Sequence, residues 1–351
     1  MTIKYDGVEV ENFEHAYSGF YNFLFDVPSG PTSGKFTLDI NGYITTYEQE
    51  VIVPPGGSWQ QTATIEEYVV YGTQFQIGKN FYFGVGYYPD NGGILQFSTS
   101  SFYKFDCETE QWSSLEEFPF LTDGQAPVGN FSFVIGDRGY TGGGSIIDGG
   151  KQYSLYEYDP STDSWSINAT DIPADAVNPT NSFGFSANGK GYVINPENGN
   201  VFEFNPVSDE WSLASSIPGT LPVTLLEDFV IDNIEYVALR RSDSAPIEFW
   251  KFDPQTGTWA QKSYPGLLST NGTFAFVVEG KGYIGSMDHF WEYDPVLESW
   301  ARRKPYPSYG FYRLPGFSYG KKGFSGLAGS RSYPGPGDPP NTNELYSFEV
   351  D

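Results

Sequence analysis

The chain has 351 residues, and its 44 acidic and 19 basic side chains give a formal charge of −25 at pH 7. Because such a charge repels phosphate groups, we expect no nucleic-acid partner. No apolar run of about eighteen residues occurs and no basic start precedes an apolar stretch, so we expect no direct membrane insertion and see no signal peptide. The single cysteine, Cys107, excludes an intrachain disulfide and leaves the redox compartment open.

Aromatic residues make up 18% of the chain, which also contains 41 glycines and 25 prolines. Apolar and polar residues alternate in short runs, and the heptad patterns of long helices are missing. This composition predicts an all-β protein with many turns, in one large domain or two smaller ones.

Residues 1–56 precede the repeat that occupies the rest of the chain. Proline and glycine clusters at 28–30 and 54–57 punctuate this segment, and the ranges between them show the alternation that is typical of strands. The predicted strands are residues 3–10, 20–27, 35–43 and 45–53.

Three runs in this segment resemble the second half of an immunoglobulin-like IPT/TIG domain: 4–8 (Lys-Tyr-Asp-Gly-Val), 25–28 (Phe-Asp-Val-Pro) and 33–36 (Ser-Gly-Lys-Phe). Such domains precede propellers in bacterial surface proteins, so the resemblance implies a partial β-sandwich at 1–56. The opening strands of the family are missing. Either Met1 is an internal start in a longer chain, with a signal sequence or lipoprotein anchor upstream, or the segment is a small fragment that leans on the propeller.

Five segments between residues 103 and 300 repeat one pattern without a gap. Each begins with an aromatic residue, has a second aromatic two positions later followed by Asp or Asn, and reaches a tryptophan nine positions after the first aromatic. The first aromatics are Tyr103, Tyr156, Phe202, Trp250 and Trp291, and the tryptophans are Trp112, Trp165, Trp211, Trp259 and Trp300. Four segments have proline after the Asp or Asn, which favours a tight turn between two strands.

Upstream of three of these segments the sequence predicts a second hairpin, each built around a glycine-containing turn. These hairpins cover residues 131–140, 183–192 and 274–283. Two hairpins per repeat make a four-stranded blade. The glycines at 142–144, followed by Tyr156 and Trp165, make these repeats resemble the kelch family. This resemblance covers residues 57–351 and implies a kelch-type β-propeller.

A sixth third-strand sequence at 345–349 ends without room for a turn and a tryptophan. Trp59 lies as far before Trp112 as Trp112 lies before Trp165, so the strand around Trp59 is the predicted partner. We therefore predict a six-bladed propeller that is closed by its own N-terminal side. The repeat tryptophans are predicted to pack between blades.

Residues for catalysis or metal binding are scarce. The two histidines, His15 and His289, cannot form a three-histidine zinc site, and no phosphate-binding glycine motif occurs. Galactose oxidases also use kelch propellers, but their copper site needs histidine ligands and a cysteine cross-linked to tyrosine. We predict no cofactor, no metal and no catalytic residue, and leave calcium in an acidic loop open. Asp148, Asp159 and Asp294 are interpreted as solvent-facing residues or turn caps.

Six of the seven arginines fall between residues 240 and 331. In a propeller, the connections after second strands and those between blades emerge on one face, which we name the long-loop face. Arg302 and Arg303 are expected instead as solvated residues on an outer strand. The connection at 304–313 adds aromatic side chains that suit sugar faces or protein pockets, unless they plug the pore. The predicted ligand-binding residues are Arg240, Arg241, Tyr309, Phe311, Tyr312, Arg313, Arg331 and Tyr333.

These features favour a non-catalytic binding or scaffold propeller that recognises a glycan or protein through the long-loop face. Alanine at Arg313 or Tyr309 is then expected to weaken binding and leave the fold intact. The resemblances imply a bacterial cell surface or extracellular location. The alternative is a periplasmic sugar-processing enzyme similar to sialic acid mutarotases, which are also six-bladed kelch proteins with charged residues at the pore mouth. A third class, an intracellular adaptor of the eukaryotic kelch kind, lacks a helical partner domain here.

Overall fold

The chain divides into two compact units, Met1–Pro55 and Gly56–Asp351. In the first unit, the computed structural model describes the backbone of residues 2–5, 8–12, 33–40 and 43–50. In the second, it describes residues 57–65, 69–89, 95–119, 126–146, 150–178, 182–266, 272–286, 289–307, 313–327 and 343–350.

The first unit contains one antiparallel sheet with strand order β2-β1-β3-β4. Its strands are β1 (Thr2–Tyr5), β2 (Val8–Asn12), β3 (Ser33–Ile40) and β4 (Tyr43–Glu50). The single strand predicted at 3–10 was wrong, because the structure has two strands there, β1 and β2, which pair antiparallel with each other. The strands predicted at 35–43 and 45–53 correspond to β3 and β4 with shifted ends, and the one predicted at 20–27 lies outside the described residues.

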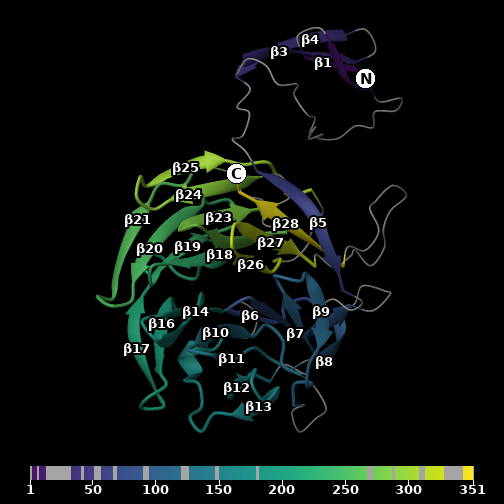
Figure 1. Ribbon diagram of the computed structural model, residues 1–351. Helices are drawn as coiled ribbons and strands as arrows, with labels where there is room; N and C mark the ends of the chain where they lie inside the picture. Colours follow the sequence, from purple (N-terminus) through teal and green to yellow (C-terminus); the bar gives the residue numbers. More distant parts are fainter. Residues whose placement is uncertain are drawn as a thin grey trace. The chain divides into compact units, whose positions relative to one another are not determined.

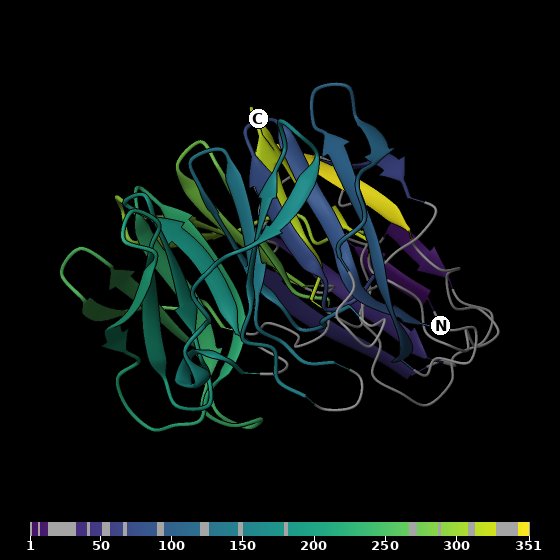
Figure 2. The ribbon, with the colours of Figure 1, turned by 90° about the horizontal axis from the view of Figure 1, so that it is seen from below.

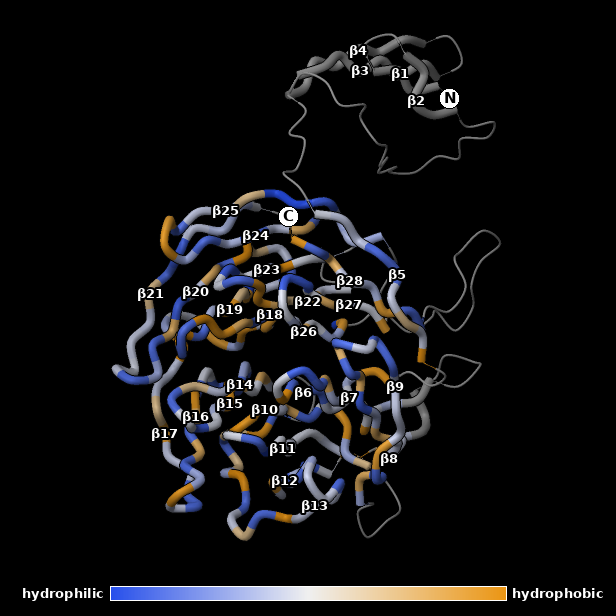
Figure 3. Tube along the Cα trace, viewed as in Figure 1, coloured by the Kyte–Doolittle hydropathy of each residue, from blue (hydrophilic) through white to orange (hydrophobic). Residues whose placement is uncertain are grey.

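The second unit is a six-bladed β-propeller, which confirms the predicted fold class (Figures 1 and 2). Each blade is a four-stranded antiparallel sheet whose first strand lies nearest the centre of the ring in Figure 1. Figure 3 shows hydrophobic and hydrophilic stretches alternating along these blades.

The strands of the first three blades follow in chain order. Blade 1 contains β6 (Thr73–Ile77), β7 (Asn80–Pro89), β8 (Leu95–Asp106) and β9 (Gln111–Ser114). Blade 2 contains β10 (Phe131–Ile135), β11 (Arg138–Gly142), β12 (Leu155–Asp159) and β13 (Ser164–Ile167). Blade 3 contains β14 (Phe183–Ala187), β15 (Lys190–Ile194), β16 (Asn200–Asn205) and β17 (Glu210–Ser216).

The other three blades complete the ring. Blade 4 contains β18 (Thr224–Ile231), β19 (Ile234–Arg240), β20 (Glu248–Asp253) and β21 (Thr258–Lys262). Blade 5 contains β22 (Phe274–Val278), β23 (Lys281–Gly285), β24 (Phe290–Asp294) and β25 (Ser299–Arg302). Blade 6 contains β26 (Gly316–Tyr319), β27 (Lys322–Gly326) and β28 (Glu344–Glu349), with β5 (Ser58–Thr64) as its outer strand.

Helix is nearly absent from the part of the chain that the structure describes. The one helical segment there is the 3-10 turn η1 (Ala174–Ala176). No helix among these residues is long and apolar enough to cross a membrane.

Blade 6 joins strands from opposite ends of the second unit. β28 pairs antiparallel with β5, and Phe348 lies opposite Trp59, which is the pairing that the spacing of Trp59 predicts. The Trp59 ring also contacts blade 5, with its centroid 5.6 Å from that of Phe274 and 5.2 Å from that of Phe290. Because the outer strand of blade 6 precedes blade 1 in the chain, this sheet ties the ends of the ring together.

The repeat tryptophans fill the space between neighbouring blades. Trp165 of blade 2 lies 4.9 Å from Phe102 of blade 1, measured between ring centroids, and Trp300 of blade 5 lies 4.9 Å from Phe249 of blade 4. Each of these tryptophans also packs on the second aromatic of its own third strand, at 4.9 Å for Tyr158 and for Tyr293. The predicted packing between blades is confirmed at these positions.

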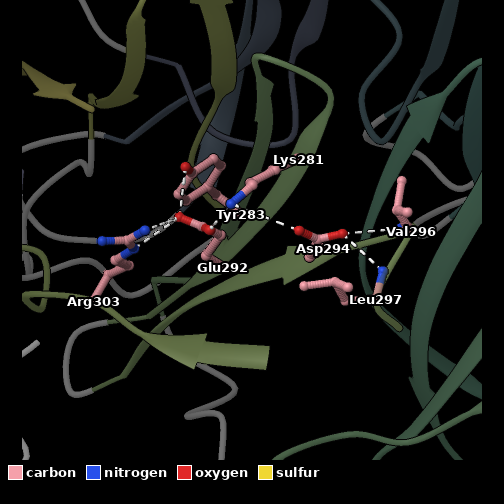
Figure 4. Close-up of polar contacts among 7 residues, drawn as sticks. All are labelled: Lys281, Tyr283, Glu292, Asp294, Val296, Leu297 and Arg303. Carbon is pink, nitrogen blue, oxygen red and sulfur yellow. Dashed lines mark hydrogen bonds and ion pairs between the residues drawn. The ribbon is translucent and has the colours of Figure 1, made fainter. Parts of the chain in front are cut away.

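The turn caps are also present. The carboxylate of Asp294 accepts hydrogen bonds from the backbone N–H groups of Val296 and Leu297, each at 2.9 Å (Figure 4). Asp159 accepts the backbone N–H of Ser161 at 2.8 Å in the same turn of blade 2. These bonds hold the pKa of Asp294 below its usual value, because they favour the charged form.

Arg303 differs from its prediction as a solvated edge residue. Glu292 on β24 is buried and accepts hydrogen bonds from the Tyr283 hydroxyl, Lys281 Nζ and Arg303 Nε, each at 2.8 Å (Figure 4). The Arg303 guanidinium is drawn inward because Glu292 is a buried carboxylate that needs charged partners. Arg302 is exposed, as predicted.

Candidate binding site in the central channel

The first strands of the blades surround a cavity of about 250 Å³ at the centre of the ring. Small-molecule pockets usually measure about 300–1,000 Å³, so this cavity suits a ligand of roughly monosaccharide size. One part of its wall, from blades 1 and 2, carries the uncharged polar residues Gln74, Asn130 and Ser132. Another part carries charged residues from blade 4 and from the connection that leads into blade 6.

Blade 4 departs from the pattern of its neighbours on its first strand. Phe229 pairs with Tyr236 in β18–β19, as Phe133 pairs with Tyr140 in blade 2, and this register aligns the repeats. Glu227 then takes the position that is phenylalanine in three other blades, namely Phe131, Phe183 and Phe274. A register shift between Leu225 and Glu227 marks a bulge at this place in β18, and bulges often re-aim side chains.

The second strand of blade 4 shows a similar departure. Glu235 precedes Tyr236, whereas glycine holds the corresponding position in four blades: Gly139, Gly191, Gly282 and Gly323. At Gly191, an added Cβ would lie 2.2 Å from the ring of Phe133 in the preceding blade. Blade 4 alone places a fully buried carboxyl group at this position among the six second strands.

Arg313 lies in the connection that leads into β26 and pairs with two carboxyl groups of blade 4. Its Nε lies 3.2 Å from both carboxylate oxygens of Glu227, and its Nη2 lies 2.5 Å from Oδ1 of Asp228. Its Cζ stands 3.8 Å from the centroid of the Phe183 ring, which adds a cation–π contact with blade 3. Glu227 and Asp228 expose only 2% and 11% of their side chains, whereas Arg313 exposes 32% and lines the cavity.

Burial controls the protonation of this cluster. It raises the pKa of Glu227 to about 7, although the Arg313 guanidinium opposes the shift. It also raises the pKa of Asp228 against the same guanidinium. The pKa of Glu235 is raised well above its usual value by burial and by the neighbouring Asp228 carboxylate. Neither oxygen of Glu235 meets a donor among the described residues, and the raised pKa favours the neutral acid, which can donate to Asp228.

The protonated state of Glu235 makes stability depend on pH. Between the unfolded-state pKa of about 4.3 and the higher folded-state pKa, the folded protein keeps a proton that the unfolded chain releases, so stability falls as pH rises. Glu235→Gln imitates the neutral acid and removes this term. We expect it to raise the free energy of unfolding at pH 8 by about 1–3 kcal/mol, since the folded protein then no longer has to take up a proton at that pH.

Urea unfolding at pH 5 and pH 8 tests this expectation. The exposed Glu210, changed to Gln, is the matched control and should alter stability by less than about 0.5 kcal/mol at either pH. A Glu235→Gln protein with the same pH dependence as the parent would show that Glu235 is ionised in the folded state.

The other arginines of the predicted site lie apart from this cavity. Arg241 donates to Glu248 at 3.0 Å and to the carbonyl oxygen of Pro218 at 2.7 Å, and it lines a separate recess beside Trp250. Arg240 pairs with Asp243 at 3.2 Å in the same β19–β20 connection. The structure therefore brings Arg313, but neither Arg240 nor Arg241, to the channel. The predicted residues Tyr309, Phe311, Tyr312, Arg331 and Tyr333 lie outside the described residues.

Sequence reasoning did not single out Glu227, Asp228 and Glu235. Their signal was present, because two of them replace phenylalanine and glycine of the repeat with acidic residues. Within the described part of the chain, no three His, Cys, Asp or Glu side chains are placed to hold a metal ion. The cluster contains ion pairs from Arg313 to Glu227 and Asp228.

Fold and site together define a six-bladed β-propeller with a charged cluster in its central channel. No protein-family model matches the sequence, and no curated protein matches it either. Among solved structures, the chain is similar to YjhT, with a TM-score of 0.57 and 14% sequence identity. The similarity covers 75% of this chain and 91% of YjhT. At this identity it supports the propeller fold alone.

Proposed function

We propose that this protein is a binding propeller whose ligand, a glycan, enters the central channel from the long-loop face. The observation that carries this proposal is the placement of Arg313, Glu227 and Asp228 at the channel wall. Contacts that only hold blades together recur from blade to blade, whereas this cluster occurs in blade 4 alone among the described strands. Buried charges are costly, and departures from a regular pattern that carry such a cost tend to mark functional sites.

We infer entry from the long-loop face because several polar residues of the cavity wall stand where the chain enters first strands. Asn130 precedes β10, Ser182 precedes β14 and Arg313 stands shortly before β26, and all three line the cavity. Carboxylate, guanidinium and amide groups converging on a small cavity suit the hydroxyl groups of a sugar. A protein side chain inserted at the same place is the other ligand that this wall would accept.

The same proposal includes two further points. The chain belongs to the kelch and IPT/TIG families, and it is located at a bacterial cell surface, with the periplasm as the alternative. They rest on the motifs of the sequence. A lipid anchor upstream of the given sequence would be consistent with that location.

Binding of the full chain to an array of immobilised glycans tests the proposal. Glycans that bind are then titrated calorimetrically against the parent and against Asp228→Asn, which keeps the shape of the side chain and removes its charge. We expect Asp228→Asn to weaken binding about tenfold, equivalent to about 1.4 kcal/mol. Asp243→Asn is the matched control, because Asp243 is 97% exposed in the β19–β20 connection. No signal from any glycan on the array would overturn the proposal.

A sugar-processing activity is the second candidate, and the pKa of about 7 at Glu227 beside Asp228 favours it. A carboxyl group that titrates near neutral pH can act as a general acid or base. If the channel catalyses such a reaction, Glu227→Gln should abolish the exchange of sugar anomers or the cleavage of glycosides measured by NMR. Equal rates for buffer and for the parent protein would exclude this candidate.

A further inference from the structure

An exposed tyrosine stands at the mouth of the same cavity. Tyr71, just before β6, lines the cavity and is 43% exposed. Its φ is +54°, a left-handed conformation that costs a residue other than glycine about 1–2 kcal/mol. Exposed aromatics held in strained backbone are typical of binding surfaces rather than of cores.

The backbone around Tyr71 is fixed on both sides. Val70 and Tyr87 exchange two backbone hydrogen bonds, of 3.0 and 2.9 Å, and the carbonyl oxygen of Tyr71 accepts the N–H of Gly129 at 2.9 Å. An added Cβ on Gly86 would lie 2.7 Å from the carbonyl oxygen of Val70, so glycine is required for this close approach. The tyrosine ring is therefore presented by a rigid support, as stacking on a flat sugar face requires.

The charges in the cavity oppose an anionic ligand. The Arg313 side chain already donates to two carboxyl groups, Glu227 and Asp228, so an incoming carboxylate meets those negative charges directly behind the guanidinium. The formal charge of −25 on the chain adds a repulsive long-range field. A hydroxyl group meets no such penalty, because it can both donate to a carboxylate and accept from a guanidinium.

An uncharged polar residue of blade 2 also lines the cavity. Asn130 lines the cavity, and its Nδ2 donates to Thr73 Oγ1 at 3.3 Å and to the carbonyl oxygen of Pro127 at 3.1 Å. Its buried Oδ1 has no donor among the described residues.

We propose that the channel site takes an uncharged sugar residue that stacks on Tyr71 and hydrogen bonds to Asp228 and Arg313, and that it rejects sugars bearing a carboxylate. This inference rests on the proposed function and specifies its ligand class. It assigns Tyr71 as the stacking platform and the carboxyl groups around Arg313 as the selectivity filter.

Matched pairs of immobilised sugars test the selectivity. The pairs are terminal glucose and glucuronate, galactose and galacturonate, and mannose and mannuronate, with sialylated and desialylated glycans beside them. We expect signals on neutral members at least about tenfold above those on their acidic counterparts. A uronate or sialoside bound as tightly as its neutral partner overturns this inference and leaves the proposed function standing. No signal on any member overturns both.

Three substitutions test the assigned roles on whichever neutral sugar binds. Tyr71→Ala should weaken binding about tenfold, whereas Tyr71→Phe keeps the ring and should stay within about twofold. Tyr153→Ala is the matched control, since Tyr153 is an exposed tyrosine that does not line the cavity. Asp228→Asn should raise the affinity for the uronate relative to its neutral partner. Unchanged affinity in a Tyr71→Ala protein with an unaltered melting curve would show that no sugar stacks on this ring.

Discussion

Deletion of residues 1–64 is expected to abolish the single cooperative unfolding transition of the propeller, whereas deletion of residues 1–55 is expected to preserve it. The longer cut removes β5, so β28 loses its partner and blade 5 loses the Trp59 ring. The shorter cut follows the boundary between the two compact units. An open ring exposes an unpaired sheet edge, which favours aggregation and loss of cooperativity.

Thermal unfolding followed by near-ultraviolet circular dichroism, with size-exclusion chromatography, separates the two deletions. The 1–55 deletion is the control, because it keeps every strand of the propeller. If both shortened chains unfold alike, the pairing of β5 with β28 does not close the ring.

Arg313→Ala is expected to lower the free energy of unfolding by about 3–5 kcal/mol at pH 8, because it leaves two buried carboxyl groups without their cation. This expectation replaces the one drawn from the sequence, that the fold would stay intact, because the sequence did not reveal the ion pairs with Glu227 and Asp228. The raised pKa of Glu227, about 7, means that the folded state binds a proton which the unfolded chain releases above about pH 4.3. Loss of Arg313 raises that pKa further, so the deficit should shrink as the pH falls from 8 to 5.

Urea denaturation at both pH values measures this effect. Arg302→Ala is the matched control, since Arg302 is exposed on β25, and it should cost less than about 0.5 kcal/mol. Adding Glu227→Gln to Arg313→Ala removes one of the unpaired charges and should restore part of the loss at pH 8. A single variant as stable as the parent at pH 8 would mean that Arg313 does not neutralise the cluster.

Much of the propeller could be predicted because its signals are local. The spacing of nine residues between Tyr156 and Trp165 reflects one hairpin, and each Asp-Pro turn can be recognised from four consecutive residues. The closure by Trp59 followed from counting strands. The pairing of β1 with β2 was missed because an alternating run shows the period of a strand but not where one strand ends and the next begins.

The channel site could be predicted only in part, because its contacts join distant parts of the chain. Arg313 and Glu227 are 86 residues apart, and only the geometry of the closed ring brings them within 3.2 Å. Clustering of arginines in the sequence pointed to a face of the propeller and could not distinguish Arg313 from Arg241, which binds its own neighbours. Arg303 was misinterpreted for a related reason. It follows β25, and its partner Glu292 lies on the neighbouring strand β24.

During synthesis, β5 cannot pair until β28 has been made. β5 ends at Thr64 and β28 begins at Glu344, so about 280 residues separate them. At roughly 5–20 residues per second, a ribosome needs about 15–60 s to make the intervening chain, and β5 waits that long without a partner. Its sequence, Ser-Trp-Gln-Gln-Thr-Ala-Thr, has one large apolar residue in seven. A polar strand of this kind resists wrong pairing with other nascent chains until its own partner has been made.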